Sequence, residues 1–249
     1  MALTEAGNLY LSRVESLVAD LDQAQDQLKA INAGPAGTLR LAASVAFGRQ
    51  CLAPLLPEFR TRFPALKLEL MLSDSNIDLV AERVDLAVRL APVLDTSLIG
   101  IKLFSTRYRV CASPGYLKRW KPLRSPKDLQ THRCLLFALP EFRSRWLFRS
   151  RNGLLQEVSV DGDVVVSNAL VLRDCVLKDM GHALLANWLI DDDIAEGRLL
   201  DLFPNYRITA TTFDTAAWLL YPSRAYLPNK VRVMIDFLKE RTRWLEPKR

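Results

Sequence analysis

The chain has 249 residues, of which 49% are hydrophobic and 25% are charged. This composition is typical of a globular protein with an ordinary core, and it excludes disordered and fibrous classes. No run approaches the roughly 18 apolar residues that a membrane helix needs. The first residues also lack the basic and apolar regions of a signal peptide. We therefore expect a cytoplasmic protein without a membrane partner.

The net charge is +6. The positive excess lies mainly in Lys118–Arg151 and in the C-terminal stretch from Arg224. In the second stretch, the basic residues in and around Val231–Leu238 are spaced as on the solvated face of a helix. A charged surface explains both segments, and an auxiliary contact with DNA phosphates remains an alternative.

No residue pattern in the sequence indicates catalysis or metal binding. The two histidines and the four cysteines do not cluster at ligand spacing, and the short phrases of common hydrolases, metalloproteases and nucleotide-binding proteins are absent. We therefore expect no catalytic residues, no metal and no cofactor. Asp191–Asp193 offers a pair of carboxylates, but it lies at an apparently exposed helix start and lacks a basic partner motif. The cysteines are expected to be reduced core residues: Cys51, Cys111, Cys134 and Cys175.

A heptad seam opens the chain. Apolar residues follow one another at alternating steps of four and three, and most of the positions between them are polar. So narrow a stripe predicts a helix that pairs with a second helix, because docking on the body of the same chain needs a wider one. The helix is expected to end at the linker Asn32–Gly37. The seam consists of Tyr10, Val14, Leu17, Leu21, Ala24, Leu28 and Ile31.

After the linker, strands alternate with helices. The hydrophobic pattern predicts strands at Thr38–Ser44, Lys67–Leu72 and Asp85–Leu90, with helices at Gly48–Phe63 and Ile77–Glu82 between them. Crossovers this short indicate a parallel, right-handed α/β unit. Two further strands are expected at Leu98–Phe104 and Tyr108–Ser113, and Pro114 then opens a helical turn.

The second half repeats this logic. The predicted strands are Leu135–Phe137, Trp146–Phe148, Leu154–Val160, Asp163–Val166, Ala183–Asn187 and Phe213–Tyr221, and the predicted helices are Asn168–Met180, Asp191–Ala195 and Pro228–Arg241. This order implies an α/β protein of two lobes, joined by crossing segments near Phe104–Ser113 and near Tyr206–Phe213. Ligands in open α/β sheets bind outside the carboxyl ends of the strands, so the cleft between the lobes is the expected ligand site.

Several phrases resemble the LysR-type transcriptional regulators, and their order and spacing carry the resemblance more than any single one. They are Leu3–Gly7, Gly37–Ser44, Leu55–Pro64, Val84–Arg89, Cys111–Leu117, Pro126–Cys134, Gly197–Leu199, Tyr221–Arg224 and Ile235–Leu238. The resemblance implies two Rossmann-like lobes of the type 2 periplasmic-binding-protein class behind a long linker helix. Residues 1–33 would form the linker and dimerisation helix, and residues 34–249 the effector-binding domain. Lobe I would comprise residues 38–107 and 213–249, and lobe II residues 108–212.

The same resemblance implies a function. The chain would sense a small effector and form a homodimer or homotetramer, and the family reads DNA through a winged helix-turn-helix that precedes the linker helix. That head is expected to lie outside this chain. A solute receptor of a transport system, which shares the two-lobed fold, remains the alternative. The heptad helix and the missing signal peptide argue against it.

The effector-binding candidates lie where strands or turns meet the expected cleft: Ser44, Val45, Phe47, Ser73, Asp74, Arg89, Ser167, Asn168 and His182. Helix starts present unpaired N–H groups, and an arginine fork matches a carboxylate, so a small carboxylate or polar aromatic effector is expected. Each residue also has a structural alternative. The serines and Asn168 would serve as helix caps, Phe47 as a core residue and Arg89 as the partner of Asp74 or Asp85.

The sequence departs from the family pattern at three positions. Met180–Asn187 replaces a glycine-rich phrase that ends in proline, which places His182 close to the expected cleft edge. Asn187 stands where that proline is common, so the turn around Trp188 is uncertain. Arg83 stands where a glycine is usual.

Overall fold

The computed structural model describes residues 34–246 except 76, 92–97, 121–122, 133 and 223–226; before residue 34 it describes only 4, 6, 7, 10, 13, 14 and 18. Tyr10 and Val14 of the predicted seam are helical, and Tyr10 is exposed. The other seam residues lie outside the described part: Leu17, Leu21, Ala24, Leu28 and Ile31.

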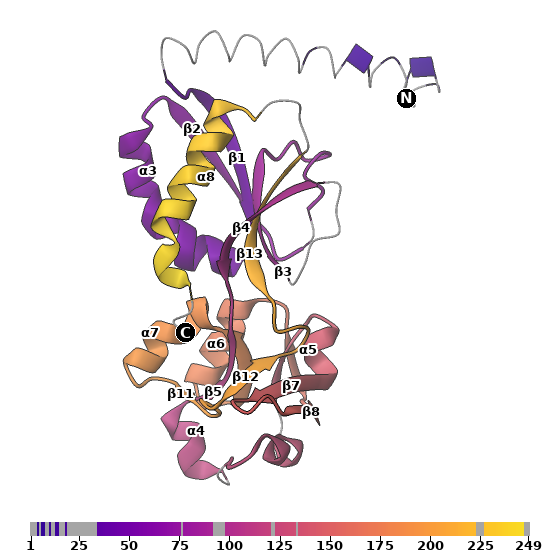
Figure 1. Cartoon of the computed structure of the whole chain (residues 1–249), viewed down its shortest axis with the longest axis vertical. Helices are drawn as coiled ribbons and strands as arrows, with labels where there is room; N and C mark the ends of the chain where they lie inside the picture. The colour runs from indigo at the N-terminus through magenta and orange to yellow at the C-terminus, as the bar shows by residue number, and fades with distance from the viewer. Residues whose placement is uncertain are drawn as a thin grey trace.

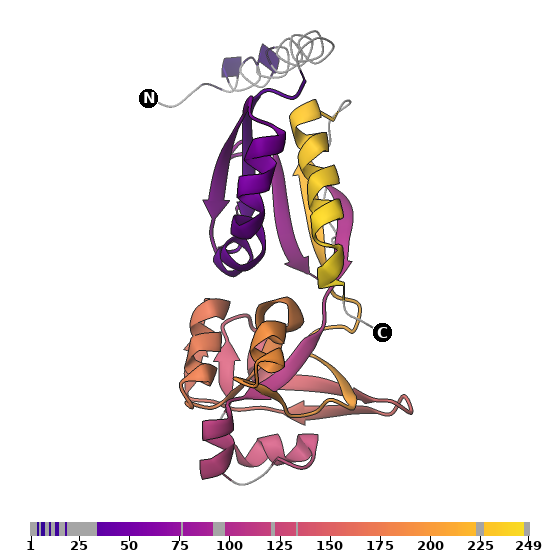
Figure 2. The same cartoon turned by 90° about the vertical axis from the view of Figure 1, so that its left-hand side faces the viewer.

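Lobe I is built on a five-stranded sheet in the order β2-β1-β3-β13-β4. Its strands are β1 (Gly37–Ala43), β2 (Leu66–Leu72), β3 (Leu86–Ala91), β4 (Leu98–Ser105) and β13 (Ala216–Pro222). The first three pair in parallel, and β13 runs antiparallel to β3 and β4. Helices α3 (Leu56–Arg62) and α8 (Asn229–Arg241) lie side by side on one face of this sheet (Figure 1; Figure 2).

The helical connection after β1 starts earlier than predicted and changes geometry along its length. It begins with α2 (Val45–Phe47), passes through a π-helical turn (Gly48–Leu52) and a 3-10 turn (Ala53–Leu55), and continues as α3. Ser44 starts it as an N-cap, and Pro54 lacks the N–H that a regular helix would need there.

The helix predicted at Ile77–Glu82 is wrong. This segment forms turns, in which the N–H of Glu82 donates to the carbonyl oxygen of Asp78 at 3.0 Å. The turns end at Arg83, whose φ of 52° lies in the left-handed region. Glycine adopts this conformation without strain, which explains why a glycine is usual here.

Lobe II contains a second sheet in the order β10-β5-β12-β7-β8, with β11 beside β5, and a separate parallel pair β6-β9. The strands are β5 (Tyr108–Ala112), β6 (Leu135–Phe137), β7 (Arg145–Ser150), β8 (Leu155–Ser159), β9 (Val164–Val166), β10 (His182–Ala186), β11 (Leu200–Asp201) and β12 (Tyr206–Thr209). The helices are α4 (Pro114–Arg119), α5 (Glu141–Ser144), α6 (Ala169–Leu177) and α7 (Asn187–Ala195), with 3-10 turns at Pro126–Thr131 and, in the C-terminal region, Arg243–Leu245.

Two expectations for this half need correction. Tyr206–Thr209 is a strand of the lobe II sheet and not part of a crossing segment, because it pairs with β7. Helix α7 begins at Asn187 and not at Asp191. The second crossing segment is therefore short and runs from Ala210 to Thr215.

The two crossing segments are bonded to each other at the hinge. The N–H of Thr106 donates to the carbonyl oxygen of Thr215 at 2.8 Å, and the Thr106 hydroxyl donates to Oγ1 of Thr215 at 2.8 Å. The Thr215 hydroxyl in turn donates to the carbonyl oxygen of Thr106 at 3.2 Å. Both threonines are buried, so water does not compete for these bonds.

One hydrophobic core continues from lobe I into lobe II. Phe47 of α2 packs edge to face on Trp188 of α7, with ring centroids 5.5 Å apart, and stacks on Phe104 of β4 at 6.2 Å. Phe47 is completely buried and Trp188 is 6% exposed. A second core, centred on Trp146 and Phe148, lies wholly within lobe II.

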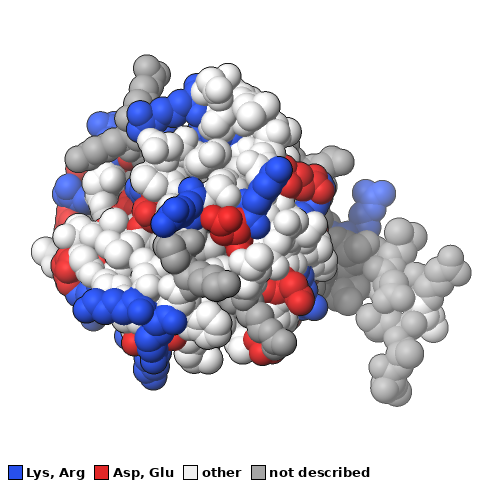
Figure 3. Space-filling model, turned by 90° about the horizontal axis from the view of Figure 1, so that it is seen from below, with Lys and Arg blue, Asp and Glu red and all other residues white. Residues whose placement is uncertain are grey.

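The charges on the lobe II end of the surface are dispersed, and the buried cysteine thiols are protonated. Viewed from the lobe II end, lysine and arginine side chains project at several separate places with acidic residues between them (Figure 3). All four cysteines are free, and three of them are buried. Burial raises the pKa of Cys51 and of Cys134 to about 12, which keeps both thiols protonated. Among the described residues, no helix is long and apolar enough to cross a membrane.

Candidate functional site

Three predicted residues lie at one level across the carboxyl edge of the lobe I sheet. Ala43 of β1 pairs with Leu72 of β2, and Ala42 pairs with Ala87 of β3. Continuing this parallel register brings Ser44, Ser73 and Arg89 to the same level. The geometry therefore gathers two hydroxyls and a guanidinium at the edge of lobe I that faces lobe II.

Asp74 bridges the two lobes at this edge. Its Oδ1 accepts a hydrogen bond from the N–H of Val45 at 3.1 Å, within lobe I. Its Oδ2 accepts one from Nδ2 of Asn168, across the lobe boundary, at 2.6 Å. The carboxylate thus occupies the Val45 amide that we expected to face a ligand, and it links that amide to lobe II.

The serines at the site have local roles as well. Ser44 Oγ accepts from the N–H of Phe47 at 3.2 Å, which caps the helical segment. Ser73 Oγ accepts from the N–H of Ser75 at 3.1 Å. Ser167 is exposed. Asn168 caps α6 because its Oδ1 accepts from the N–H groups of Leu170 and Val171. Capping leaves the Ser44 hydroxyl proton available as a donor, whereas the Asn168 amide already donates one of its two protons to Asp74.

Arg89 does not form the ion pair that was the structural alternative. Its Nη2 donates to the carbonyl oxygen of Ile77 at 3.0 Å. Asp85 instead accepts from Nζ of Lys230 at 2.9 Å. Within the described part of the chain, no carboxylate lies at ion-pair distance from Arg89, and burial lowers the pKa of its guanidinium. A partly buried cation without an anion is a suitable anchor for an anionic ligand.

Two candidate residues lie inside the protein instead of at the cleft. Phe47 is 0% exposed and belongs to the shared core, so it does not form an open apolar wall. His182 is also 0% exposed. It pairs with Ala112 at the end of β10 that lies farthest from the hinge, whereas Ala186 at the other end pairs with Tyr108. The expectation that His182 lies close to the cleft edge is wrong.

His182 belongs to a buried polar and aromatic cluster in lobe II. Its Nε2 lies 3.2 Å from Cys134 Sγ, and its ring centroid lies 5.8 Å from that of His132 and 5.9 Å from that of Tyr116. Tyr116 bonds to Nδ1 of His132 at 3.2 Å. Burial, with a smaller contribution from His132, lowers the pKa of His182 to about 4. The imidazole is therefore neutral at physiological pH. No metal-binding group of three ligands occurs among the described residues.

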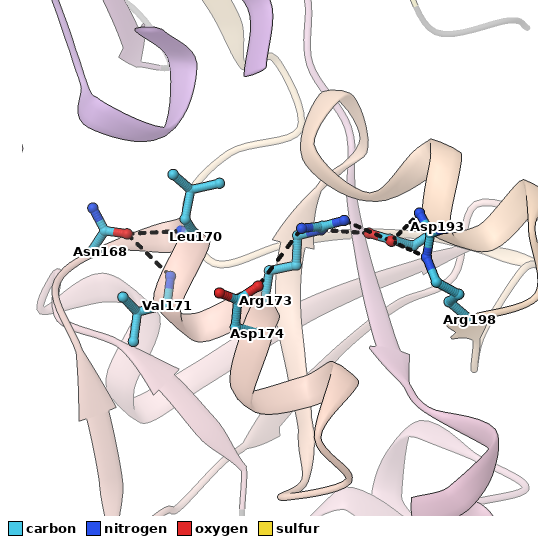
Figure 4. A network of polar contacts seen from close by, with 7 residues as sticks. All are labelled: Asn168, Leu170, Val171, Arg173, Asp174, Asp193 and Arg198. Carbon is cyan, nitrogen blue, oxygen red and sulfur yellow. Dashed lines mark hydrogen bonds and ion pairs between the residues drawn. The ribbon is translucent and has the colours of Figure 1, made fainter. Parts of the chain in front are cut away.

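A buried ion network fixes helices α6 and α7 against each other (Figure 4). Asp193 of α7 is completely buried and binds Arg173 of α6 through two bonds, Nε to Oδ2 at 2.5 Å and Nη2 to Oδ1 at 2.7 Å. Arg198 adds a third, from Nε to Oδ1 at 2.8 Å. The prediction of an exposed acidic segment without basic partners is therefore wrong for Asp193. Asp191 is exposed, as predicted, but it has a basic partner, because its Oδ1 lies 3.1 Å from Nε of Arg109.

Asn187 is a site-forming residue that the sequence did not identify as one. It is buried, and its N–H donates to the carbonyl oxygen of Arg107 at 2.8 Å. Its Oδ1 accepts from the N–H of Arg107 at 2.9 Å. The bonds tie the start of α7 to the first crossing segment and place Trp188 against Phe47. The sequence signal that could have identified Asn187 is its occurrence at a position where proline is common in the family phrase.

The comparisons with known proteins agree on one family. The sequence profile of the LysR substrate binding domain matches residues 32–243. The chain is 32% identical over 240 residues to the HTH-type transcriptional regulator CrgA of Neisseria meningitidis, covering 96% of this chain and 79% of that protein. It is 30% identical to PtxR of Pseudomonas aeruginosa, covering 96% and 75%. The solved structure of CrgA superposes with a TM-score of 0.74 at 30% identity, covering 96% of this chain and 80% of CrgA.

Proposed function

Because the chain belongs to the LysR-type transcriptional regulators, we propose that its two lobes bind a small carboxylate effector at the edge where Ser44, Ser73 and Arg89 meet. The effector-sensing role follows from the family. The ligand class and the residues are inferences from the site. In this proposal residues 34–249 form the effector domain and residues 1–33 the dimerisation helix.

Arg89 is the observation that supports a carboxylate. A guanidinium that loses hydration by burial and has no carboxylate partner among the described residues gains most from a bound anion. The Ser44 and Ser73 hydroxyls, at the same level, add hydrogen-bond donors. A neutral aromatic ligand would leave the charge of Arg89 uncompensated, so it is the weaker alternative.

The bond between Asp74 and Asn168 couples effector binding to the relative arrangement of the two lobes. An effector carboxylate that binds beside Asp74 repels the Asp74 carboxylate and weakens its bond to Asn168 across the boundary. The effector thereby shifts the balance between lobe arrangements, by a coupling free energy typically of about 1–3 kcal/mol. Paired linker helices carry this shift to the DNA-binding part of the regulator.

The remaining parts of the proposal follow from this role. The chain works in the cytoplasm as a homodimer or homotetramer, and it catalyses no reaction. Tyr10 is helical and 73% exposed in the single chain. This supports pairing through the N-terminal helix, because an interface would remove the apolar surface of this large aromatic side chain from water.

The test is a thermal-shift screen of small carboxylates against the parent chain, followed by calorimetry of the hits. An effector raises the melting temperature by mass action. We expect Arg89→Gln to weaken binding at least tenfold and Arg60→Gln, an exposed arginine on α3, to leave it unchanged. Equal affinity of the parent and Arg89→Gln for the effector would refute the site.

A further inference from the structure

A pocket lies on lobe II beside the hinge, separate from the lobe I edge that carries Arg89. Its volume is about 90 Å³, and its lining comes from the start of β5, from β12 and from both crossing segments. Thr106 and Thr215, which bond the two segments together, are part of the wall. Ser44, Ser73 and Arg89 do not line it.

The lining carries excess positive charge. Arg107, Arg109 and Arg207 contribute three cations, and Asp201 is the acid in the lining. Arg109 has two carboxylate partners, because its Nη1 binds Asp201 at 2.9 Å and its Nε lies 3.1 Å from Oδ1 of Asp191, which is outside the lining. With Asp191 counted, three guanidinium groups against two carboxylates still leave the wall positive, and such a concave, basic wall attracts anions.

The guanidinium of Arg207 is held in place before any ligand arrives. Its Nη2 donates to the carbonyl oxygen of Phe213 at 2.9 Å, and its Cζ lies 5.7 Å from the centroid of that ring. The Cζ of Arg149 lies 4.0 Å from the same centroid. A restrained guanidinium loses less conformational entropy on binding, and four of its five N–H donors are not used by Phe213.

We propose that this hinge pocket is a second ligand site that binds a small oxyanion, a phosphate or a small carboxylate, through Arg207 and Arg107. Thr212, an exposed hydroxyl in the lining, adds a hydrogen-bond donor. The arginines and threonines of the wall favour a compact polar anion over an aromatic one. Since the wall includes both crossing segments, the bound anion stabilises the hinge as found here.

The test titrates inorganic phosphate and, in a separate arm, succinate into the full chain in a chloride buffer at constant ionic strength. Calorimetry gives the affinity, and thermal melting without anion confirms that each variant is folded. We expect saturable binding of at least one anion, weakened at least tenfold by Arg207→Gln and by Arg107→Gln. The stronger arm identifies which oxyanion the site prefers. Thr212→Val, on the surface of the pocket, is a second variant that leaves the arginines intact and is expected to weaken binding severalfold.

Two controls separate this site from the effector site. Arg60→Gln tests for a general effect of charge, and Arg89→Gln tests for binding at the lobe edge; both are expected to retain parental affinity for the anion. The proposal is overturned if neither anion saturates, if Arg60→Gln weakens binding as much as Arg207→Gln, or if only Arg89→Gln weakens it. The last result would assign the anion to the effector site and so support that proposal while removing this one.

Discussion

Asn187 and Arg107 exchange two hydrogen bonds, one through the backbone at 2.8 Å and one through the Asn187 side chain at 2.9 Å. A proline at position 187 has neither the N–H nor the amide oxygen that these bonds need. Asn187, at the position where the family phrase commonly ends in proline, therefore adds a direct link between helix α7 and the hinge.

Removing this link should destabilise the chain. We expect Asn187→Ala to lower the free energy of unfolding by about 1–3 kcal/mol, because the N–H of Arg107 loses its acceptor in a partly buried place. Urea denaturation measures the change. Asn205→Ala, at an exposed asparagine in the turn before β12, is the matched control and should change stability by less than about 0.5 kcal/mol. Equal effects of the two substitutions would contradict the role of Asn187.

The Asp74 bridge should be visible in hydrogen exchange. In Asp74→Ala, the amide of Val45 loses its acceptor and the lobes lose their bond through Asn168. We expect exchange at Val45–Phe47 and at the start of α6 to accelerate about fivefold to tenfold, which corresponds to roughly 1 kcal/mol. Asp236→Ala, at an exposed aspartate of α8, should leave both segments unchanged. Unaltered exchange in Asp74→Ala would show that the bridge does not hold the lobes.

The buried Asp193 should be among the most sensitive positions of lobe II. Asp193→Ala leaves the partly buried Arg173 with only its longer pair to the exposed Asp174 at 3.7 Å, and loss of one member of a buried pair costs about 3–5 kcal/mol. Its neighbour Asp192 is exposed, so Asp192→Ala supplies a control one residue away, with an expected change below about 0.5 kcal/mol. Chemical denaturation measures the free energy of unfolding of both variants. A decrease of less than about 1 kcal/mol in Asp193→Ala would show that the network contributes little to stability.

His182 predicts a pH dependence of stability. Its pKa is about 4 in the folded chain, below the ordinary histidine value of 6.5, so the unfolded chain binds the extra proton between these values. Stability from this group is complete above about pH 6.5 and falls as the pH drops toward 4, by on the order of 3 kcal/mol. The groups facing the imidazole are His132, Tyr116 and Cys134.

The measurement compares the parent with His182→Gln across this range, because the difference between them removes the contribution of the carboxylates. We expect the parent to lose its stability more steeply between about pH 6.5 and pH 4. Parallel profiles would mean that His182 is not buried as a neutral ring.

The sequence predicted most of the scaffold, because each strand and helix of an α/β lobe carries its own periodicity. The parallel strands β1, β2 and β3 and the C-terminal helix α8 were found within one or two residues of their bounds. Segments whose structure depends on distant partners were missed. Strand β12 is short and is defined by its pairing with β7, and the segment from Ile77 lacks the length that makes a helix pattern distinctive.

The sequence predicted which strand ends carry the site residues, but it did not predict which groups those side chains bind. Ser44, Ser73 and Arg89 follow from parallel register alone. That Asp74 bonds to Asn168, some ninety residues away in sequence, or that Asp193 is buried between two arginines, depends on how the lobes and helices pack. His182 shows the same limit, since a lone histidine in sequence does not reveal which end of its strand is near the hinge.

The contact between Phe47 and Trp188 also determines how the chain can come apart. Since the same core extends through both lobes, neither lobe can melt without exposing apolar surface of the other, and denaturation should follow one sigmoidal curve for both. The indole of Trp188, whose N–H has no partner among the described residues, lies at this junction. Because the chain has five tryptophans, the difference in emission between the parent and Trp188→Phe isolates the signal from this boundary.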